Sequence, residues 1–188
     1  MTRGSGLIAI LTLLSACGAS APRMQHIAEG HQPGEEAAVL EVLDRYVTAI
    51  SETDLEAQAA MLMPEGMTYI WRPIYHQDED GIWRPAEGGG MEIVARPNSH
   101  WTDPSRDDGR VRRERYWSPT VVIRGGIAVV WAPYEFWVDG ETSHCGVDVF
   151  DFVKIDGKWL VSNSMWTVEP KACTELRPVE TSNLRPED

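Results

Sequence analysis

The sequence is short of basic residues: 17 lysines and arginines stand against 29 aspartates and glutamates, which gives a formal net charge of −12. Proteins that bind nucleic acids favour basic faces that neutralise phosphates, so this balance argues against a nucleic-acid partner. The chain also lacks internal repeats and low-complexity blocks. Its 188 residues, 43% of them hydrophobic, are enough for one domain with a hydrophobic core.

The N-terminal segment has no apolar run long enough for a membrane span. The run Leu7–Leu14 is far too short to cross a bilayer, but with the small residues and the cysteine that follow it resembles a bacterial lipoprotein signal. The resemblance implies a signal peptide at 1–16, a lipid on Cys17 that anchors the protein in a membrane, and a flexible tether at 17–34. By the same resemblance, Gly18 favours the outer membrane of the bacterial envelope, with the domain facing the periplasm. The alternative is plain secretion without lipidation.

Cysteines are also few, with three in the chain. Beyond Cys17, the even pair Cys145 and Cys173 in an oxidising compartment predicts a disulfide. The alternative is a nucleophilic Cys145 beside His144. Neighbours along a strand point to opposite faces, so this pair is poorly placed for cysteine–histidine catalysis. The acidic segment around His76 matches no known ligand spacing, and the sequence predicts neither a metal nor a cofactor.

The strongest pattern lies in residues 111–168. Apolar runs rich in β-branched and aromatic residues are separated by RGG, VDGE and IDGK, and Asp-Gly and Gly-Gly are typical of tight hairpins. The pattern predicts four consecutive antiparallel strands at about 113–124, 127–138, 141–155 and 158–168. Both faces of this sheet are apolar, so we expect helices on one face and a second layer or a partner on the other. A homodimer through the outer face is one such arrangement.

A register follows if each turn is a two-residue loop. Glu135 then lies opposite both Tyr116 and His144, and Asp148 lies between Trp131 and Met165. A single bulge would exchange the two faces beyond it. Without bulges, one face carries the candidate site residues Tyr116, Trp131, Glu135, His144, Asp148, Phe150, Asn163 and Met165.

Shorter patterns flank the sheet. Before the sheet, apolar residues at helical spacing predict helices, and Asp54 is a candidate N-cap. Turn residues separate the predicted elements. The tail at 171–188 is polar and is expected to be irregular. The predicted elements before the sheet are helices at 35–50 and 54–63, a strand at 67–72, a hairpin within 73–90 and a short helix at 91–96.

Two N-terminal helices followed by a long antiparallel meander resemble the nuclear transport factor 2-like superfamily, which includes the SnoaL-like and putative lumazine-binding families. The segment VVWAPYEFWVDGETSHCGVDVFDFVKIDGKW carries the resemblance most strongly. It implies an α+β fold over 35–170, in which N-terminal helices pack on a strongly curved antiparallel sheet to form a cone-shaped α+β barrel. Such a fold hosts many unrelated activities, so the resemblance is specific for fold.

Ketosteroid isomerase is a member of this superfamily that the chain resembles at two segments, LDRYVTAISETDLEAQAAML and VDVFDFVKIDGKW. The match places Tyr46 at the oxyanion-hole tyrosine. It places Asp148 at the aspartic acid that an apolar site keeps protonated in that enzyme. At the positions of that enzyme's general base, Trp71 and Arg72 supply no carboxylate. The resemblance therefore implies two hydrogen-bond donors without the base.

Three functional hypotheses remain open on these grounds. The first is a lipoprotein whose cavity binds a small hydrophobic or aromatic ligand through Trp131, Tyr116, Phe150, Asn163 and Met165. The second is an isomerase or a dehydratase, resembling scytalone dehydratase, that uses His144, Glu135, Asp148 and Tyr46 in acid–base catalysis. The third is an envelope scaffold. Against the second, a Glu–His pair near a strand end is more often a solvated cross-strand pair.

Overall fold

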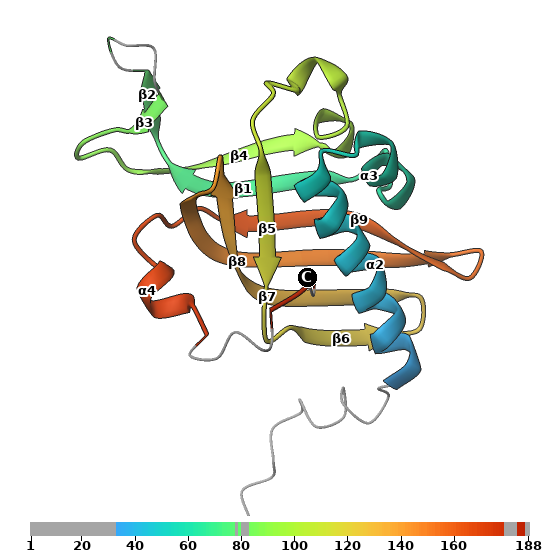
Figure 1. Ribbon diagram of the computed structural model, residues 1–188. Coiled ribbons are helices and arrows are strands. Elements are labelled where there is room, and N and C mark those ends of the chain that lie inside the picture. Colours follow the sequence, from blue (N-terminus) through green and yellow to red (C-terminus); the bar gives the residue numbers. More distant parts are fainter. Residues whose placement is uncertain (1–32, 78, 80–82, 179–183, 187–188) are drawn as a thin grey trace, which may run out of the picture.

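The computed structural model describes residues 33–77, 79, 83–178 and 184–186. The predicted signal peptide, the lipidation site Cys17 and the predicted tether up to residue 32 lie outside the described residues. Within them, no helix is both long enough and apolar enough to cross a membrane. One long helix lies across a face of a curved sheet, and the chain's last described residues return to that sheet (Figure 1).

Two N-terminal helices form as predicted. Helix α2 (Pro33–Glu52) buries one apolar stripe, which includes Val39, Leu43 and Tyr46. It begins two residues inside the stretch assigned above to the tether. Helix α3 (Leu55–Met61) begins after Asp54, whose side chain accepts a hydrogen bond from the backbone N–H of Ala57 at 2.9 Å. This bond satisfies one of the free donors of the first turn.

The main sheet has seven strands, and six of them follow the order β4-β1-β9-β8-β7-β5, with β6 also paired to β7. Strands β1 and β9 pair in parallel and the other neighbours are antiparallel, so the sheet is mixed where an antiparallel one was expected. A separate hairpin of β2 and β3 lies within the predicted segment. The strands are β1 (Met67–Pro73), β2 (Tyr75–Gln77), β3 (Trp83–Pro85), β4 (Met91–Pro97), β5 (Arg112–Tyr116), β6 (Thr120–Arg124), β7 (Ile127–Val138), β8 (Glu141–Ile155) and β9 (Lys158–Thr167).

Two predicted elements are wrong. The segment predicted as a helix at 91–96 is strand β4, which pairs with β1 along its whole length. The single strand predicted at 113–124 is broken into β5 and β6. Ser118 adopts a positive φ of 46° at the break, and Pro119 follows it without an N–H to give to a ladder.

Two bulges change the predicted register. Both Asp-Gly turns form as expected, with positive φ at all four residues. In β8, however, Ser143 is an extra residue, because Trp137 pairs with Thr142 while Phe136 pairs with His144. In β9, Ser162 is extra in the same way. Glu135 consequently pairs with Cys145 instead of His144, and Asp148 pairs with Ala132 and Trp166 instead of Trp131 and Met165.

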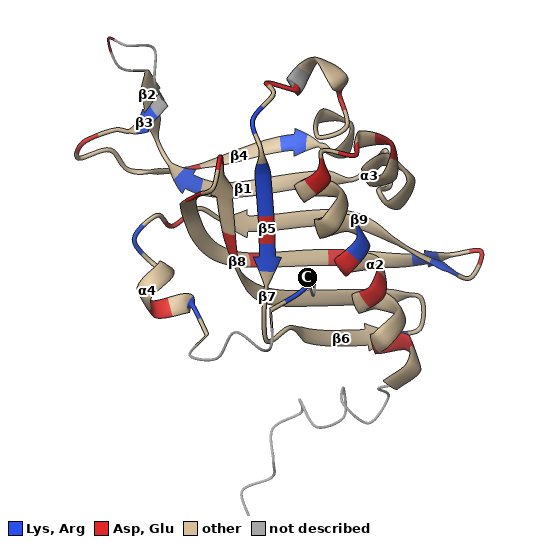
Figure 2. Cartoon of the chain, in the orientation of Figure 1, with Lys and Arg blue, Asp and Glu red and all other residues tan. Residues whose placement is uncertain are grey.

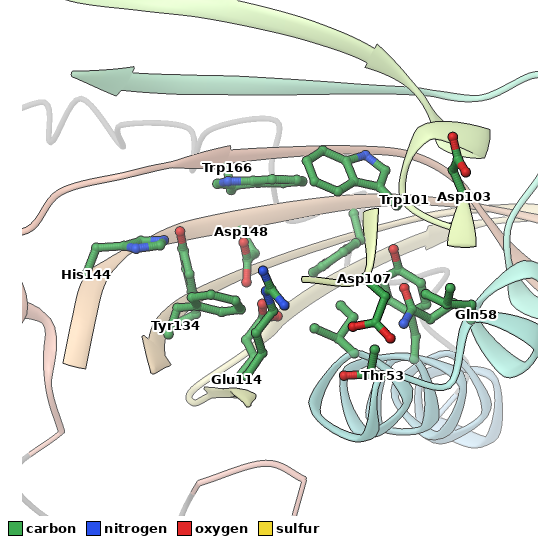
Figure 3. A pocket seen from close by; sticks show the side chains of 16 residues that line it. Thr53, Gln58, Trp101, Asp103, Asp107, Glu114, Tyr134, His144, Asp148 and Trp166 are labelled. Atoms are coloured by element: carbon green, nitrogen blue, oxygen red, sulfur yellow. The ribbon is translucent and has the colours of Figure 1, made fainter. Parts of the chain in front are cut away.

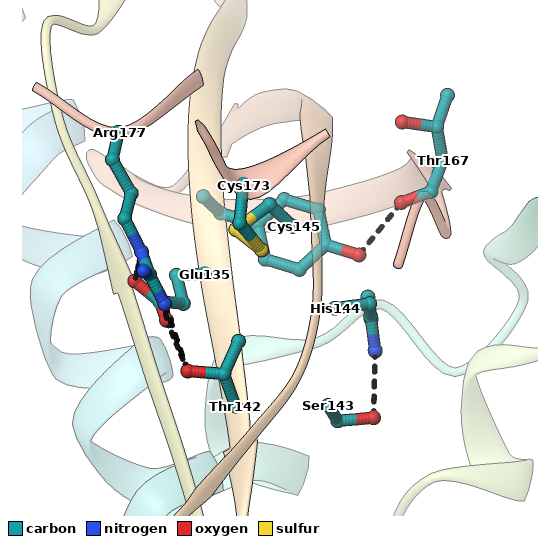
Figure 4. The surroundings of a disulfide bond; sticks show 9 residues. Glu135, Thr142, Ser143, His144, Cys145, Thr167, Cys173 and Arg177 are labelled. Carbon is teal, nitrogen blue, oxygen red and sulfur yellow. Dashed lines mark hydrogen bonds and ion pairs between the residues drawn. A yellow bond between two sulfur atoms is a disulfide. The ribbon is translucent and has the colours of Figure 1, made fainter. Parts of the chain in front are cut away.

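The C-terminal segment is fastened to the sheet. The predicted disulfide joins Cys145 of β8 to Cys173, the first residue of helix α4 (Cys173–Leu176). On the same outer face, Arg177 donates from Nε to Glu135 at 2.8 Å, as Figure 4 shows. Further on, Arg185 pairs through its backbone with Tyr116. Within the described part of the tail there is one short helix, and the tail is held to the sheet at three points.

Candidate functional site

A cavity of about 300 Å³ lies between the inner face of the sheet and the helices. Helices α2 and α3 close one side. The loop that carries the 3-10 helices η1 (Asn98–His100) and η2 (Pro104–Arg106) closes another. A volume of this order is typical of small-molecule sites. Among the lining side chains, Figure 3 labels Trp101, Glu114, Tyr134, His144, Asp148 and Trp166. The lining also includes Tyr46, Phe136 and Phe150.

Asp148 is the most unusual polar group in the cavity. Its side chain is only 3% exposed, and its Oδ2 atom has no hydrogen-bond partner. Desolvation raises the pKa of this carboxyl well above its ordinary value, and the nearby charge of Glu114 raises it further. Burying a carboxyl without a hydrogen-bond partner is costly. The packing of the protein alone therefore does not explain why an aspartate occupies position 148.

Glu114 is a second buried carboxyl in the same cavity, and the sequence analysis missed it. It lies on β5 between Arg113 and Arg115, as Figure 2 shows. Alternation along a strand could have revealed it, because the middle residue of three points away from its neighbours. Glu114 is 8% exposed, and desolvation raises its pKa to about 7.

Two tyrosines stand near these carboxyls. Burial raises the pKa of Tyr46, and the charges of Glu114 and Asp148 raise it further, so its hydroxyl stays protonated. Burial likewise raises the pKa of Tyr134, whose hydroxyl donates to the carbonyl oxygen of Thr167 at 2.7 Å. Its ring lies against Gly146, its cross-strand partner on β8.

Gly146 leaves the space that the ring of Tyr134 occupies. A Cβ at this position would lie 2.1 Å from the carbonyl oxygen of Thr167 and 2.8 Å from Cε1 of Tyr134. Any other residue would therefore displace the backbone of Thr167, the ring of Tyr134, or both.

His144 is neutral at physiological pH. Desolvation lowers its pKa to about 4, and its ring packs against Tyr134 and Phe136 with centroid distances of 5.6 and 5.3 Å. Its Nδ1 lies 3.0 Å from Oγ of Ser143. The histidine thus brings a hydrogen-bonding ring to the cavity and no positive charge.

The predicted Glu135–His144 pair is wrong. The bulge at Ser143 leaves His144 on the inner face and Glu135 on the outer face, where Glu135 forms an ion pair with Arg177 and accepts a hydrogen bond from Thr142 at 2.6 Å. Glu135 is therefore part of the attachment of the tail and does not line the cavity.

The other candidate residues divide between the two faces. His144, Asp148 and Phe150 line the cavity, as the predicted parity of β8 requires, and Tyr46 of α2 lines it as well. Trp131 and Met165 lie on the outer face and are 46% and 43% exposed. Neither Tyr116 nor Asn163 lines the cavity: Tyr116 donates to Asp44 of α2 at 2.6 Å, and Asn163 accepts from the backbone N–H of Met67 at 3.0 Å.

The outer face carries a row of large apolar side chains. Cross-strand pairing places Tyr69, Met165, Val149 and Trp131 side by side on β1, β9, β8 and β7. Ile93 on neighbouring β4 is 72% exposed. Apolar patches of this kind often mark protein interaction surfaces.

The described residues contain one group of side chains close enough together to hold a metal ion: Glu135, Cys145 and Cys173. Both cysteines are joined in the disulfide, and Glu135 is bound to Arg177. This group is therefore part of the covalent and ionic attachment of the tail.

Helices packed over one face of a curved sheet, with a cavity between them, define the cone-shaped fold of the nuclear transport factor 2-like and cystatin-like proteins. The fold predicted from the sequence is thereby confirmed. No protein-family model matches the sequence, and no curated protein matches it.

Several solved structures are similar to the chain. A protein of unknown function with a cystatin-like fold from Nostoc punctiforme is 12% identical, with 74% of this chain and 95% of that chain covered and a TM-score of 0.54. A nuclear transport factor 2-like protein of unknown function from Shewanella baltica is 19% identical, with 75% and 98% covered and a TM-score of 0.51. A nuclear transport factor 2-like protein from Cytophaga hutchinsonii is 16% identical, with 73% of this chain and 99% of that chain covered and a TM-score of 0.53. At these identities the likeness shows the fold alone.

Proposed function

We propose that the protein binds a small, largely apolar molecule in the cone cavity and holds a polar group of that molecule at Asp148. The observation that carries this proposal is the unpartnered Oδ2 of a carboxyl that is 3% exposed and lines the cavity. Buried polar groups are nearly always hydrogen-bonded, and a ligand would supply the bond that the protein does not.

The aromatic walls support an apolar ligand body. Trp101 and Trp166 lie 5.3 Å apart between ring centroids, and Phe150 packs edge-on against Tyr46 at 6.1 Å. Flat aromatic surfaces around a few polar groups are typical of small-molecule sites.

We also propose a subcellular location for the protein. A lipid on Cys17 would anchor the binding domain to the outer membrane of a bacterial envelope, facing the periplasm. The lipoprotein-like signal in the sequence supports this, and so does the disulfide, because disulfides persist in oxidising compartments. Metabolic labelling with palmitate is expected to mark the wild-type protein and to leave Cys17→Ser unlabelled.

Native mass spectrometry of the protein purified from its own host tests ligand binding. We expect a bound organic molecule on the wild-type protein and its loss from Asp148→Leu, which removes the polar contact and roughly keeps the volume. The matched control is Asp151→Leu, because Asp151 lies on the same strand with its side chain on the outer face, away from the cavity. An empty wild-type protein that also binds no aromatic compound would contradict the proposal.

A second function is favoured by Glu114. A buried carboxyl with a pKa of about 7 is suited to act as a general base, and it shares the cavity with Tyr46 and Asp148 as donors. Isomerase or dehydratase chemistry would then use Glu114 in place of the Glu135–His144 pair. Turnover of the identified ligand, abolished in Glu114→Gln while binding persists, would establish it.

A further inference from the structure

The charges around the cavity restrict the ligand further, if the cavity binds a ligand as proposed above. We infer that this ligand carries a protonated amine, held between the carboxyls of Glu114 and Asp148 while its apolar body lies among the aromatic rings. The nitrogen's N–H groups would donate to Oδ2 of Asp148, the atom that has no partner in the protein.

Acidic groups outnumber basic ones around the cavity. The carboxyls that line it belong to Asp103, Asp107, Glu114 and Asp148. Among the lining residues Arg112 is the one with a permanent positive charge. Its guanidinium already forms a two-pronged pair with Asp108, at 2.9 and 2.8 Å.

The remaining titratable groups that line the cavity do not add a positive charge. His144 is neutral because its pKa is lowered to about 4, and the hydroxyls of Tyr46 and Tyr134 stay protonated. When either buried carboxyl ionises, the cavity therefore contains an uncompensated negative charge. A cation is the ligand that relieves it.

The walls favour an organic cation over a metal ion. The aromatic rings of Trp101, Trp166 and Tyr46 present π faces that attract ammonium groups. Within the described ranges, Glu114 and Asp148 have no third carboxylate, histidine or cysteine gathered with them at metal-binding distance. The net charge of −12 would also raise the association rate of a cationic ligand.

A neutral ligand with a carbonyl group is the main alternative. It would accept a hydrogen bond from protonated Asp148, and ionisation of Glu114 would repel its oxygen. The two ligand classes therefore respond to pH with opposite signs. An ammonium ligand replaces a proton on the carboxyl pair, so it binds more tightly as pH rises. A carbonyl ligand needs that proton, so it binds more weakly.

Calorimetric titration of the full protein with matched pairs of compounds tests the inference. The probes are benzylamine, 2-phenylethylamine and tryptamine, each compared with the alcohol that has the same apolar body. We expect at least one amine to bind more than about tenfold tighter than its alcohol at about pH 8. Between about pH 6 and about pH 8, the affinity of this amine should rise by about tenfold. The reason is that binding releases one proton from the carboxyl pair, and the pKa of Glu114 is about 7. Aliphatic amines resemble lysine, whose pKa is about 10.4, and stay protonated throughout.

Two variants and one control locate the effect. Glu114→Gln and Asp148→Asn should each remove most of the preference for the amine, whereas Asp151→Asn on the outer face should keep it. Alcohols that bind as tightly as the amines, or an affinity that falls with pH, would overturn the inference and leave the proposed binding function standing. Binding of neither class, together with an empty protein in native mass spectrometry, would overturn both.

Discussion

Glu114→Gln is expected to make the ligand-free protein more stable above neutral pH. The carboxyl's ordinary pKa is 4.5, and desolvation in the folded state raises it to about 7. A group whose pKa is raised by folding contributes stability that is fully present below about pH 4.5 and is lost as the pH rises to about 7. At about 1.4 kcal/mol per pH unit, the loss amounts to about 3 kcal/mol. Glutamine keeps the shape of the protonated acid and avoids this loss.

Urea denaturation of both proteins at a series of pH values measures the effect. The variant should match the wild type near pH 4.5, the ordinary pKa, and exceed its free energy of unfolding by about 3 kcal/mol above pH 7. The lowered pKa of His144 gives a pH dependence of opposite sign in both proteins, so it cancels in the difference. Relief of Asp148 from the charge of Glu114 adds in the expected direction.

The control is Glu141→Gln, which changes an exposed carboxylate beside the turn between β7 and β8. It should leave the free energy of unfolding unchanged to within about 0.5 kcal/mol across the range. A difference between Glu114→Gln and wild type that stays constant with pH would show that Glu114 is not desolvated, and would refute the reasoning.

Three more outcomes are expected. Gly146→Ala should lower the free energy of unfolding by about 3 kcal/mol, because its Cβ would meet a backbone carbonyl of β9 at 2.1 Å. The control is Gly126→Ala, whose Cβ would have no atom nearer than 3.7 Å. This control should leave the free energy of unfolding unchanged in the same urea assay. Cys173→Ser should lower the free energy of unfolding by about 3 kcal/mol, because it removes a cross-link that spans 28 residues. A reductant should lower the free energy of unfolding of the wild type by a similar amount. If the apolar outer face joins two copies, the arrangement considered in the sequence analysis, the wild type should sediment as a dimer and Ile93→Lys as a monomer. A wild-type monomer at high concentration would contradict this.

The strands β7, β8 and β9 were predictable because their signals are local. Alternating apolar residues define each strand, and the turns at Asp139-Gly140 and Asp156-Gly157 carry the residues that positive φ values favour. The bulges were not predictable in this way. Ser143 and Ser162 are small and polar and fit either face of a sheet, so nothing in the alternation marks them as extra residues.

The error in register had a direct effect on the predicted site. On β8 the parity was right, so His144, Asp148 and Phe150 line the cavity. On β7 the pairing with β8 was displaced by one residue beyond the bulge, which put Trp131 and Glu135 on the cavity side and left out Tyr134 and Phe136. A site assembled across strands depends on registers that lie beyond local sequence signals.

Strand β4 shows a different limit. Met91, Glu92, Ala95 and Arg96 favour a helix, and the segment ends at a proline. Pairing with β1 along seven residue pairs overrides this preference, because β structure depends on partners more than on intrinsic propensity. The break between β5 and β6, in contrast, was marked in the sequence by Ser118-Pro119.

The attachment of the C-terminal segment determines when the cavity can form. Arg185 forms an ion pair with Asp44, and the two residues are 141 positions apart in the chain. The same segment pairs with Tyr116, two residues from Glu114. Contacts this distant in sequence slow folding, because loop closure comes before any gain from the contact. The contacts that hold this part of the wall beside Glu114 are therefore completed only after the segment around Arg185 has been synthesised.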